Sequence, residues 1–192
     1  MLVGGRRYSL AVTSFHAFLG CSMDGFIASP DGELDWLVRF DDRLGDSGYD
    51  AFFSSIDALV MGRASYDAIR RQSPDLYDGR PVYVLSRTLP VGPQPEMGRS
   101  PVSVYSDPSA LRAALAADGV ERAYVDGGRT VQTFLAEGLL SDIVITRVPV
   151  LIGDGIPLFG PVPRPVLAEL LETRELGAGA VQSTYRFSVT SR

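Results

Sequence analysis

The chain has 192 residues, of which 45% are hydrophobic and 21% are charged, with a formal net charge of −5. This acidic balance, without a cluster of basic residues, argues against nucleic acid as the main partner. One cysteine, Cys21, and one histidine, His16, exclude an internal disulfide, a thiolate metal cluster and a His-rich metal site. No apolar stretch reaches the ~20 residues needed to span a bilayer, so we expect a cytoplasmic protein without membrane contact.

The first quarter of the chain predicts a tail, a strand and a helix. Residues 1–14 are expected to be a flexible tail before a single domain over 15–192, because the apolar run after Arg7 is too short for a signal peptide. Residues 15–22 are apolar and predict a buried first strand, which continues toward 23–28 and a turn at 29–32. Aromatic and apolar residues at helical spacing predict a helix within 46–56.

The middle of the chain alternates between strands and helices. Predicted strands are 58–61, 80–85, 102–105 and 122–125, and predicted helices are 65–71, 108–117 with Ser106 or Asp107 as its cap, and 129–137. Residues 91–101 are rich in proline and glycine and predict a loop. Such alternation implies right-handed crossovers and a mainly parallel sheet.

The last third of the chain has a different pattern. A long strand is predicted over 142–151, and two further strands, 166–176 and 181–189, are joined through the small residues 177–180. These two strands predict an antiparallel hairpin. The expected fold is therefore α/β, with a mixed, mostly parallel sheet flanked by helices and a C-terminal antiparallel hairpin.

Three predicted strands end in turns of similar chemistry. These turns are Gly62-Arg63, Ser86-Arg87 and Asp126-Gly127-Gly128-Arg129-Thr130. Carboxyl ends of parallel strands share one edge of a sheet, where α/β folds bind ligands. Glycine allows close backbone approach, arginine suits phosphate, and helix starts supply amide donors. The turns predict a dinucleotide site, and two arginines favour the extra phosphate of NADP.

Together with two further segments, these turns resemble a known fold. The segments are Ser-Met-Asp-Gly-Phe-Ile-Ala at 22–28 and Gly-Asp-Gly-Ile-Pro-Leu-Phe at 153–159, and a third motif extends the first turn to Met-Gly-Arg-Ala-Ser-Tyr-Asp at 61–67. The set is similar to the dihydrofolate reductase fold. More narrowly, it resembles the reductase domain of the bifunctional riboflavin-biosynthesis deaminase/reductase and its stand-alone relatives, over roughly residues 15–190.

The resemblance implies an NADPH-dependent oxidoreductase, with NADPH along the strand ends. The residues implied to bind the cofactor are Gly20, Ile27, Gly62, Arg63, Ser65, Ser86, Arg87, Gly127, Gly128, Arg129 and Thr130. Among them, the backbones of Gly20 and Ile27 would flank the nicotinamide carboxamide. Relatives of this type are often dimers, so a homodimer is possible, with strands 144–151 and 181–189 pairing across a two-fold axis.

The substrate side departs from the riboflavin reductases. Phe26 stands where those enzymes usually carry a basic residue, and the nearby rings of Trp36, Tyr49 and Phe53 suit a flat apolar substrate. These four residues are predicted to contact substrate. The zinc-binding deaminase motif is missing from the chain. Candidate proton donors are Asp24, and Asp46 or Asp50 in the region where dihydrofolate reductases place a carboxylate.

The leading hypothesis is hydride transfer from NADPH to a small, aromatic or heterocyclic C=N or C=O substrate. One alternative is a riboflavin-pathway 5-amino-6-(5-phosphoribosylamino)uracil reductase, which predicts a cationic pocket on the substrate side. The other is a non-catalytic NADPH-binding module, in which Trp36 or Phe52 would block the substrate side.

Overall fold

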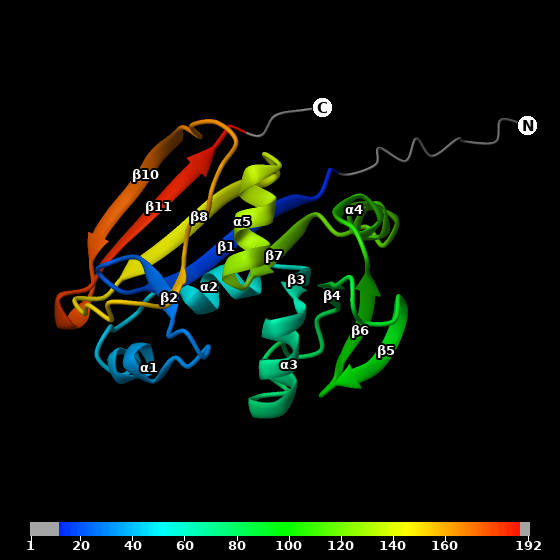
Figure 1. Ribbon diagram of the computed structural model, residues 1–192, viewed down its shortest axis with the longest axis horizontal. Helices are drawn as coiled ribbons and strands as arrows, with labels where there is room; N and C mark the ends of the chain where they lie inside the picture. The colour runs from blue at the N-terminus through cyan, green and yellow to red at the C-terminus, as the bar shows by residue number, and fades with distance from the viewer. Residues whose placement is uncertain (1–11, 189–192) are drawn as a thin grey trace, which may run out of the picture.

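The computed structural model describes residues 12–188, so residues 1–11 of the tail predicted over 1–14 lie outside the described residues, and Ser14 begins the first strand. These residues form eleven strands and five α-helices (Figure 1). The strands are β1 (Ser14–Cys21), β2 (Phe26–Ala28), β3 (Ala58–Gly62), β4 (Val82–Leu85), β5 (Gly92–Met97), β6 (Ser100–Tyr105), β7 (Arg122–Asp126), β8 (Leu140–Arg147), β9 (Ile156–Pro157), β10 (Ala168–Glu175) and β11 (Val181–Phe187). The helices are α1 (Asp35–Asp41), α2 (Tyr49–Ser54), α3 (Arg63–Gln72), α4 (Pro108–Ala117) and α5 (Gly128–Ala136).

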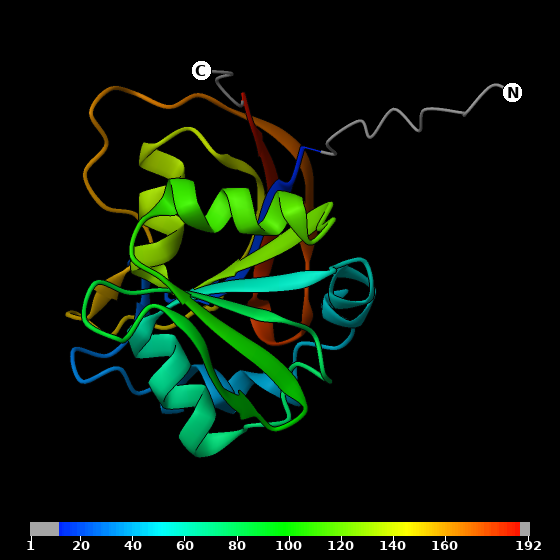
Figure 2. The ribbon, with the colours of Figure 1, turned by 90° about the vertical axis from the view of Figure 1, so that its right-hand side faces the viewer.

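Nine of these strands form one twisted sheet in the order β10-β11-β8-β1-β7-β3-β4-β6-β5 (Figure 2). The neighbours from β8 to β6 pair in parallel. At the two ends, β10, β11 and β8 pair antiparallel, as do β5 and β6. The predicted mixed, mostly parallel sheet with a C-terminal antiparallel hairpin is confirmed. In the described part of the chain, no helix has the length and apolar character to cross a membrane.

Helices cover both faces of the sheet. On one face, α4 and α5 bury Leu111, Leu115 and Phe134 against Val60 and Val125. On the other face, α2 and α3 bury an aromatic layer. The Asp107 carboxylate caps α4 by accepting the Ala110 amide proton at 2.9 Å, and the helix has its predicted bounds. This packing holds the carboxyl ends of the parallel strands along one edge.

Residues 91–101 were predicted to be a loop, and that prediction is wrong. They form β5 and the start of β6, with Gly92 opposite Val104 and Gln94 opposite Val102. Proline lacks the amide proton that an interior strand needs, but an edge strand tolerates it. β5 is an edge strand with Pro93 and Pro95, so its composition imitates a loop while its backbone is extended.

Two helical regions also differ from expectation. The helix expected within 46–56 covers only Tyr49–Ser54, because Gly48, with a φ of 76°, is left-handed and ends the preceding turn at the start of α2. α1 follows the turn at 29–32 and was not predicted. Its half-buried Trp36 and Leu37 pack against Val148 and Leu176. A helix of only seven residues is marginally stable alone, so α1 depends on these contacts with residues distant in sequence.

The expected pairing of strands 144–151 and 181–189 across a two-fold axis is wrong. β8 lies between β1 and β11, and β11 lies between β8 and β10. Both strands therefore use both of their hydrogen-bonding edges within one chain. Only β10 and β5 present a free edge in the described sheet.

Candidate functional site

Two helices begin side by side at the carboxyl ends of β3 and β7. A Cβ atom on Gly62 would lie 3.0 Å from the Thr130 hydroxyl oxygen, and one on Gly127 would overlap the Ser65 hydroxyl. Neither Gly62 nor Gly127 can cap its helix with a side chain, and although the Thr130 amide donates to the Gly127 carbonyl, the first amides of α3 and α5 have no side-chain cap. Two adjacent helix starts of this kind form a cradle suited to an anionic group.

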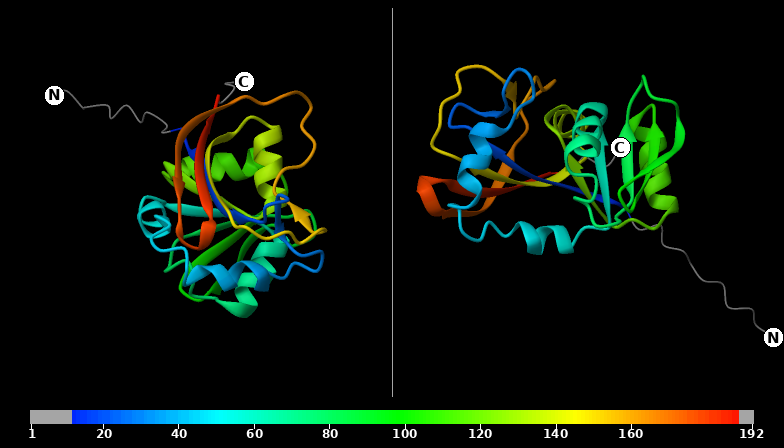
Figure 3. Two further views of the ribbon diagram at one scale, coloured as in Figure 1. Left: turned by 90° about the vertical axis from the view of Figure 1, so that its left-hand side faces the viewer. Right: turned by 90° about the horizontal axis from the view of Figure 1, so that it is seen from below.

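The segment after β1 reaches the same place. A Cβ atom on Gly128 would lie 2.5 Å from Ile27 Cδ1, so the Ile27 side chain packs directly on this glycine. Gly20, near the end of β1, would meet the Leu37 side chain of α1 at 2.8 Å. Figure 3 (right), from below, shows α1 and α3 on opposite sides of this edge. The structure thus brings Ile27 to the glycine turns.

The turn after β4 is tied to α3 through Arg63. Arg63 Nη1 donates to Thr88 Oγ1 at 2.9 Å, and its Nε donates to Asp67 Oδ2 at 3.2 Å. The hydroxyl of Ser86 accepts the amide protons of Thr88 and Leu89 and so fixes this turn.

Not every predicted cofactor residue makes such a contact. The side chains of Arg87 and Arg129 are exposed at the same edge. Nine of the eleven predicted cofactor residues take part in the contacts above: Gly20, Ile27, Gly62, Arg63, Ser65, Ser86, Gly127, Gly128 and Thr130.

The sheet opens between β1 and β7 beside these turns. Ser14–His16 pair with Arg122–Tyr124, but beyond that point β1 follows β8 as far as Cys21 and β7 follows β3 as far as Asp126. The Tyr124 hydroxyl donates to the Phe18 carbonyl across the opening at 2.9 Å. Parallel strands that separate in this way leave unpaired backbone groups, which a planar polar ring can satisfy.

Asp126 stands at the end of β7, where the sheet opens. The residue is half-buried, and the Tyr77 hydroxyl donates to Oδ2 at 3.1 Å. Burial raises the pKa of Asp126, and the hydrogen bonds from Tyr77 and the Gly127 backbone offset part of that rise. Tyr49 lies close by, and burial with the nearby Asp126 charge raises its pKa to about 12. A carboxyl group that tends to keep its proton at a ligand-binding edge is a candidate general acid.

Sequence reasoning assigned no role to Asp126. It was noted only as the residue before the Gly127-Gly128 pair. The available signal was an acidic residue that ends an otherwise buried strand at a ligand-binding edge. Its hydrogen-bond donor, Tyr77, lies 49 positions earlier in the chain.

Comparison with known proteins assigns the chain to a family. The model of the RibD C-terminal domain family matches residues 15–182. The chain belongs to this family. The resemblance seen in the strand-end motifs is therefore confirmed, and RibD C-terminal domain membership supports a function of the riboflavin-pathway reductase type.

Two relatives match over nearly their whole length. A structure titled "Putative riboflavin biosynthesis protein", from Shewanella sp. PV-4, is 33% identical with a TM-score of 0.79, covering 92% of this chain and 99% of that one. Bacillus subtilis (strain 168) YwjB is 29% identical over 170 residues, which is 88% of this chain and 94% of YwjB. A pyrimidine reductase-like protein from Corynebacterium diphtheriae, at 15% identity and a TM-score of 0.62 with 93% of each chain covered, shares the fold.

Within this RibD C-terminal domain, Asp24 joins two loops. Ser22 Oγ donates to Asp24 Oδ1 at 2.5 Å, and the Gly153 amide donates to Oδ2 at 2.8 Å. The Ser22 hydroxyl bond lowers the pKa of Asp24, and the loop amides add to that effect. These contacts use the carboxylate to hold the β1–β2 loop against the loop after β8.

The second predicted acid, Asp46, shapes the turn before α2. Its Oδ1 accepts the Gly48 amide proton at 2.7 Å, and the residue is exposed. Asp50 is also exposed, in the first turn of α2. Asp126 is thus half-buried at the glycine turns, whereas Asp24, Asp46 and Asp50 are exposed.

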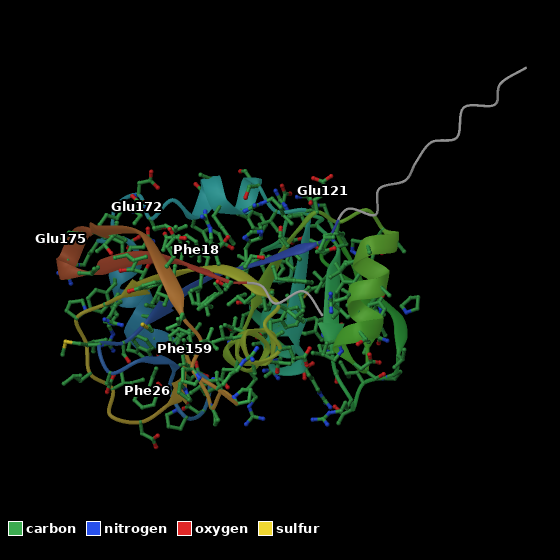
Figure 4. All side chains as sticks on the ribbon, turned by 90° about the horizontal axis from the view of Figure 1, so that it is seen from above. Phe18, Phe26, Glu121, Phe159, Glu172 and Glu175 are labelled. Carbon is green, nitrogen blue, oxygen red and sulfur yellow. The ribbon has the colours of Figure 1, made fainter. Side chains whose placement is uncertain are left out.

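The four predicted substrate residues lie in three separate places. Trp36 packs under the β10–β11 tip, while Tyr49 and Phe53 belong to the aromatic layer beneath α2, with their rings stacked at 5.8 Å. Phe26 pairs with Pro157 in the small β2–β9 sheet. Figure 4 shows Phe26 and Phe159 on the side of the main sheet opposite α2. The structure does not bring these rings together into one pocket.

His16 lies near the amino end of β1, away from the glycine turns, and forms a hydrogen-bonded row with Ser14 and Asp142. Its Nδ1 is 2.8 Å from Asp142 Oδ2, and its Nε2 is 2.8 Å from Ser14 Oγ. Ser14 Oγ donates to the Glu121 carbonyl at 2.9 Å. Because that proton is engaged by a carbonyl, the row does not form a nucleophilic triad, and His16 instead ties β1 to β8.

Proposed function

We propose that this RibD C-terminal domain protein is an NADPH-dependent reductase that acts on a C=N or C=O carbon of a small aromatic or heterocyclic substrate. The proposal rests on the adjacent, uncapped starts of α3 and α5 beside the opening between β1 and β7. This cradle fits a pyrophosphate. Arg63, with the turn that contains Ser86, fits a second phosphate and so favours NADPH over NADH.

The protein's part in the reaction is to position the reactants and to supply a proton. NADPH, when bound, supplies the hydride. We assign the proton to Asp126, at the mouth of the opening. Because Oδ2 accepts the Tyr77 hydroxyl proton, the acid proton belongs on Oδ1, from which it passes to the substrate nitrogen or oxygen. The carboxylate that remains then regains a proton from water.

A second candidate substrate is 5-amino-6-(5-phosphoribosylamino)uracil, as in the riboflavin pathway. Family membership favours it, while the position of Arg80 gives it no support. The Arg80 guanidinium lies 4.0 Å from the Phe53 ring centroid, and its Nε donates to the Ile56 carbonyl at 2.9 Å. Within residues 12–188, Arg80 forms no ion pair, but Ile56 precedes the amino end of β3, whereas the glycine turns follow the carboxyl ends of β3 and β7, so Arg80 lies away from the site. Phe26, in place of a basic residue, is the observation against this substrate.

The test is a titration with NADPH and NADH, followed by turnover on dihydrofolate and on the phosphoribosylaminouracil. We expect tighter binding of NADPH. Asp126→Asn should lower kcat by about 10²–10⁴-fold without weakening NADPH binding. Asp46→Asn is the matched control and should leave kcat within about twofold.

Each result assigns the failure to one part of the proposal. If neither nucleotide binds, the proposed function is wrong. NADPH binding without turnover on any substrate favours the non-catalytic module. Unchanged turnover in Asp126→Asn would remove Asp126 from the mechanism and return attention to Asp24.

A further inference from the structure

The guanidinium of Arg63 is held on two sides. Asp67, one helical turn further along α3, accepts from Nε at 3.2 Å, and Thr88 accepts from Nη1 at 2.9 Å. Arginine carries five N–H donors, so three remain for a ligand. The Arg63 side chain is 51% exposed and that of Asp67 is 29% exposed. Arg63 is therefore both oriented and accessible.

The two acceptors differ in their effect on a bound phosphate. Thr88 is neutral, and its hydroxyl lies 3.3 Å from the hydroxyl of Ser86, so it orients Arg63 without opposing an anion. Asp67 orients Arg63 too, but its negative charge lies next to any phosphate that Arg63 binds. An exposed ion pair one turn apart contributes little to orientation. Repulsion, in contrast, acts on the nearly two negative charges of a phosphate monoester, so repulsion is the larger effect.

We propose that Asp67 competes with the cofactor's adenosine-ribose phosphate for Arg63 and thereby limits the preference for NADPH over NADH. Thr88 has the opposite effect, because it holds Arg63 in place for the phosphate. Both are positioning residues and take no part in the proton or hydride transfer. This inference rests on the proposed function, since it takes NADPH as the ligand.

The experiment measures dissociation constants for NADPH, NADH and adenosine 2′,5′-bisphosphate in Asp67→Asn and Thr88→Val. Glu121→Gln is the matched control, because it removes one negative charge just before the amino end of β7 (Figure 4), whereas Arg63 follows the carboxyl end of the parallel strand β3. We expect Asp67→Asn to bind NADPH and the bisphosphate about three- to tenfold more tightly, with NADH unchanged. This gain should shrink as salt is raised. Thr88→Val should weaken NADPH binding by about three- to tenfold.

The possible failures are distinguishable. Wild-type protein that binds neither nucleotide overturns the proposed function and this inference with it. Wild-type protein that prefers NADPH, together with Asp67→Asn that gains no affinity, overturns this inference alone. An equal gain in Glu121→Gln would show a general charge effect, and that result also overturns it.

Discussion

Two Asp-Gly pairs show how surroundings decide the chemistry of a carboxyl group. Asp24 precedes Gly25 and Asp126 precedes Gly127. A serine hydroxyl and loop amides lower the pKa of Asp24. Burial raises the pKa of Asp126. Sequence could not separate them, because the groups responsible come from distant segments, and it therefore favoured the aspartate that now holds two loops together.

The raised pKa of Asp126 predicts how stability depends on pH. Between the ordinary aspartate pKa of about 3.9 and the raised folded value, the folded state keeps a proton that the unfolded state has lost. Rising pH therefore lowers the free energy of unfolding in that range. Asp126→Asn cannot ionise, so it should gain stability relative to wild type as pH rises, measured by urea unfolding at several pH values.

Asp24→Asn provides a control of opposite sign. The folded pKa of Asp24 is lowered, so its contribution is present above the ordinary value and is lost as pH falls through the folded value. Its difference from wild type should shrink in acid. If Asp126→Asn differed from wild type by the same amount at every pH, its pKa would not be shifted.

Among the helices, strands and turns, those that depend on residues close in sequence were predicted correctly. α4 was predictable because Asp107 and Pro108 mark its start, and the glycine turns because each follows a buried strand. β5 was not, because prolines on an edge strand resemble a loop. The sequence also could not predict that Trp36 and Tyr49 lie in different hydrophobic clusters, because this depends on which part of the sheet each helix covers.

The turn between β7 and α5 should fail when Gly127 gains a side chain. Gly127 has a φ of 85°, and a Cβ atom there would overlap the Ser65 hydroxyl. Gly127→Ala should lower the free energy of unfolding by about 1–3 kcal/mol and weaken NADPH binding at least tenfold, measured by urea unfolding and titration. Gly32→Ala is the control, because Gly32 has a φ of 91° with no neighbour within 4 Å. Gly32→Ala should lose stability but keep its affinity for NADPH. If it lost as much NADPH affinity as Gly127→Ala, backbone strain alone would account for the effect of Gly127→Ala on binding.

For the whole molecule, the two edges of the sheet differ. Prolines at 93 and 95 remove amide donors from β5, which protects that edge from further pairing. β10 has no proline, and all but one of its residues are exposed. Around it, Leu167 is 85%, Leu170 54% and Leu171 41% exposed. Because a bulge follows Leu170, the strand does not offer a regular edge; Leu167, Leu170 and Leu171 are the exposed apolar side chains along it.

An apolar surface of this kind is the sort that a partner covers, and the same surface on a second copy is self-complementary about a two-fold axis. We therefore expect a homodimer through the β10 region, in place of the β8–β11 pairing that the sheet order excludes. Leu170→Glu would place a charge within the contact and should convert the protein to a monomer in light scattering after size exclusion. Val91→Glu is the control, since Val91 is 66% exposed beside the proline-protected edge, and it should remain dimeric. A wild-type protein that is monomeric at micromolar concentration would contradict the dimer, and dissociation of both variants would place the contact elsewhere.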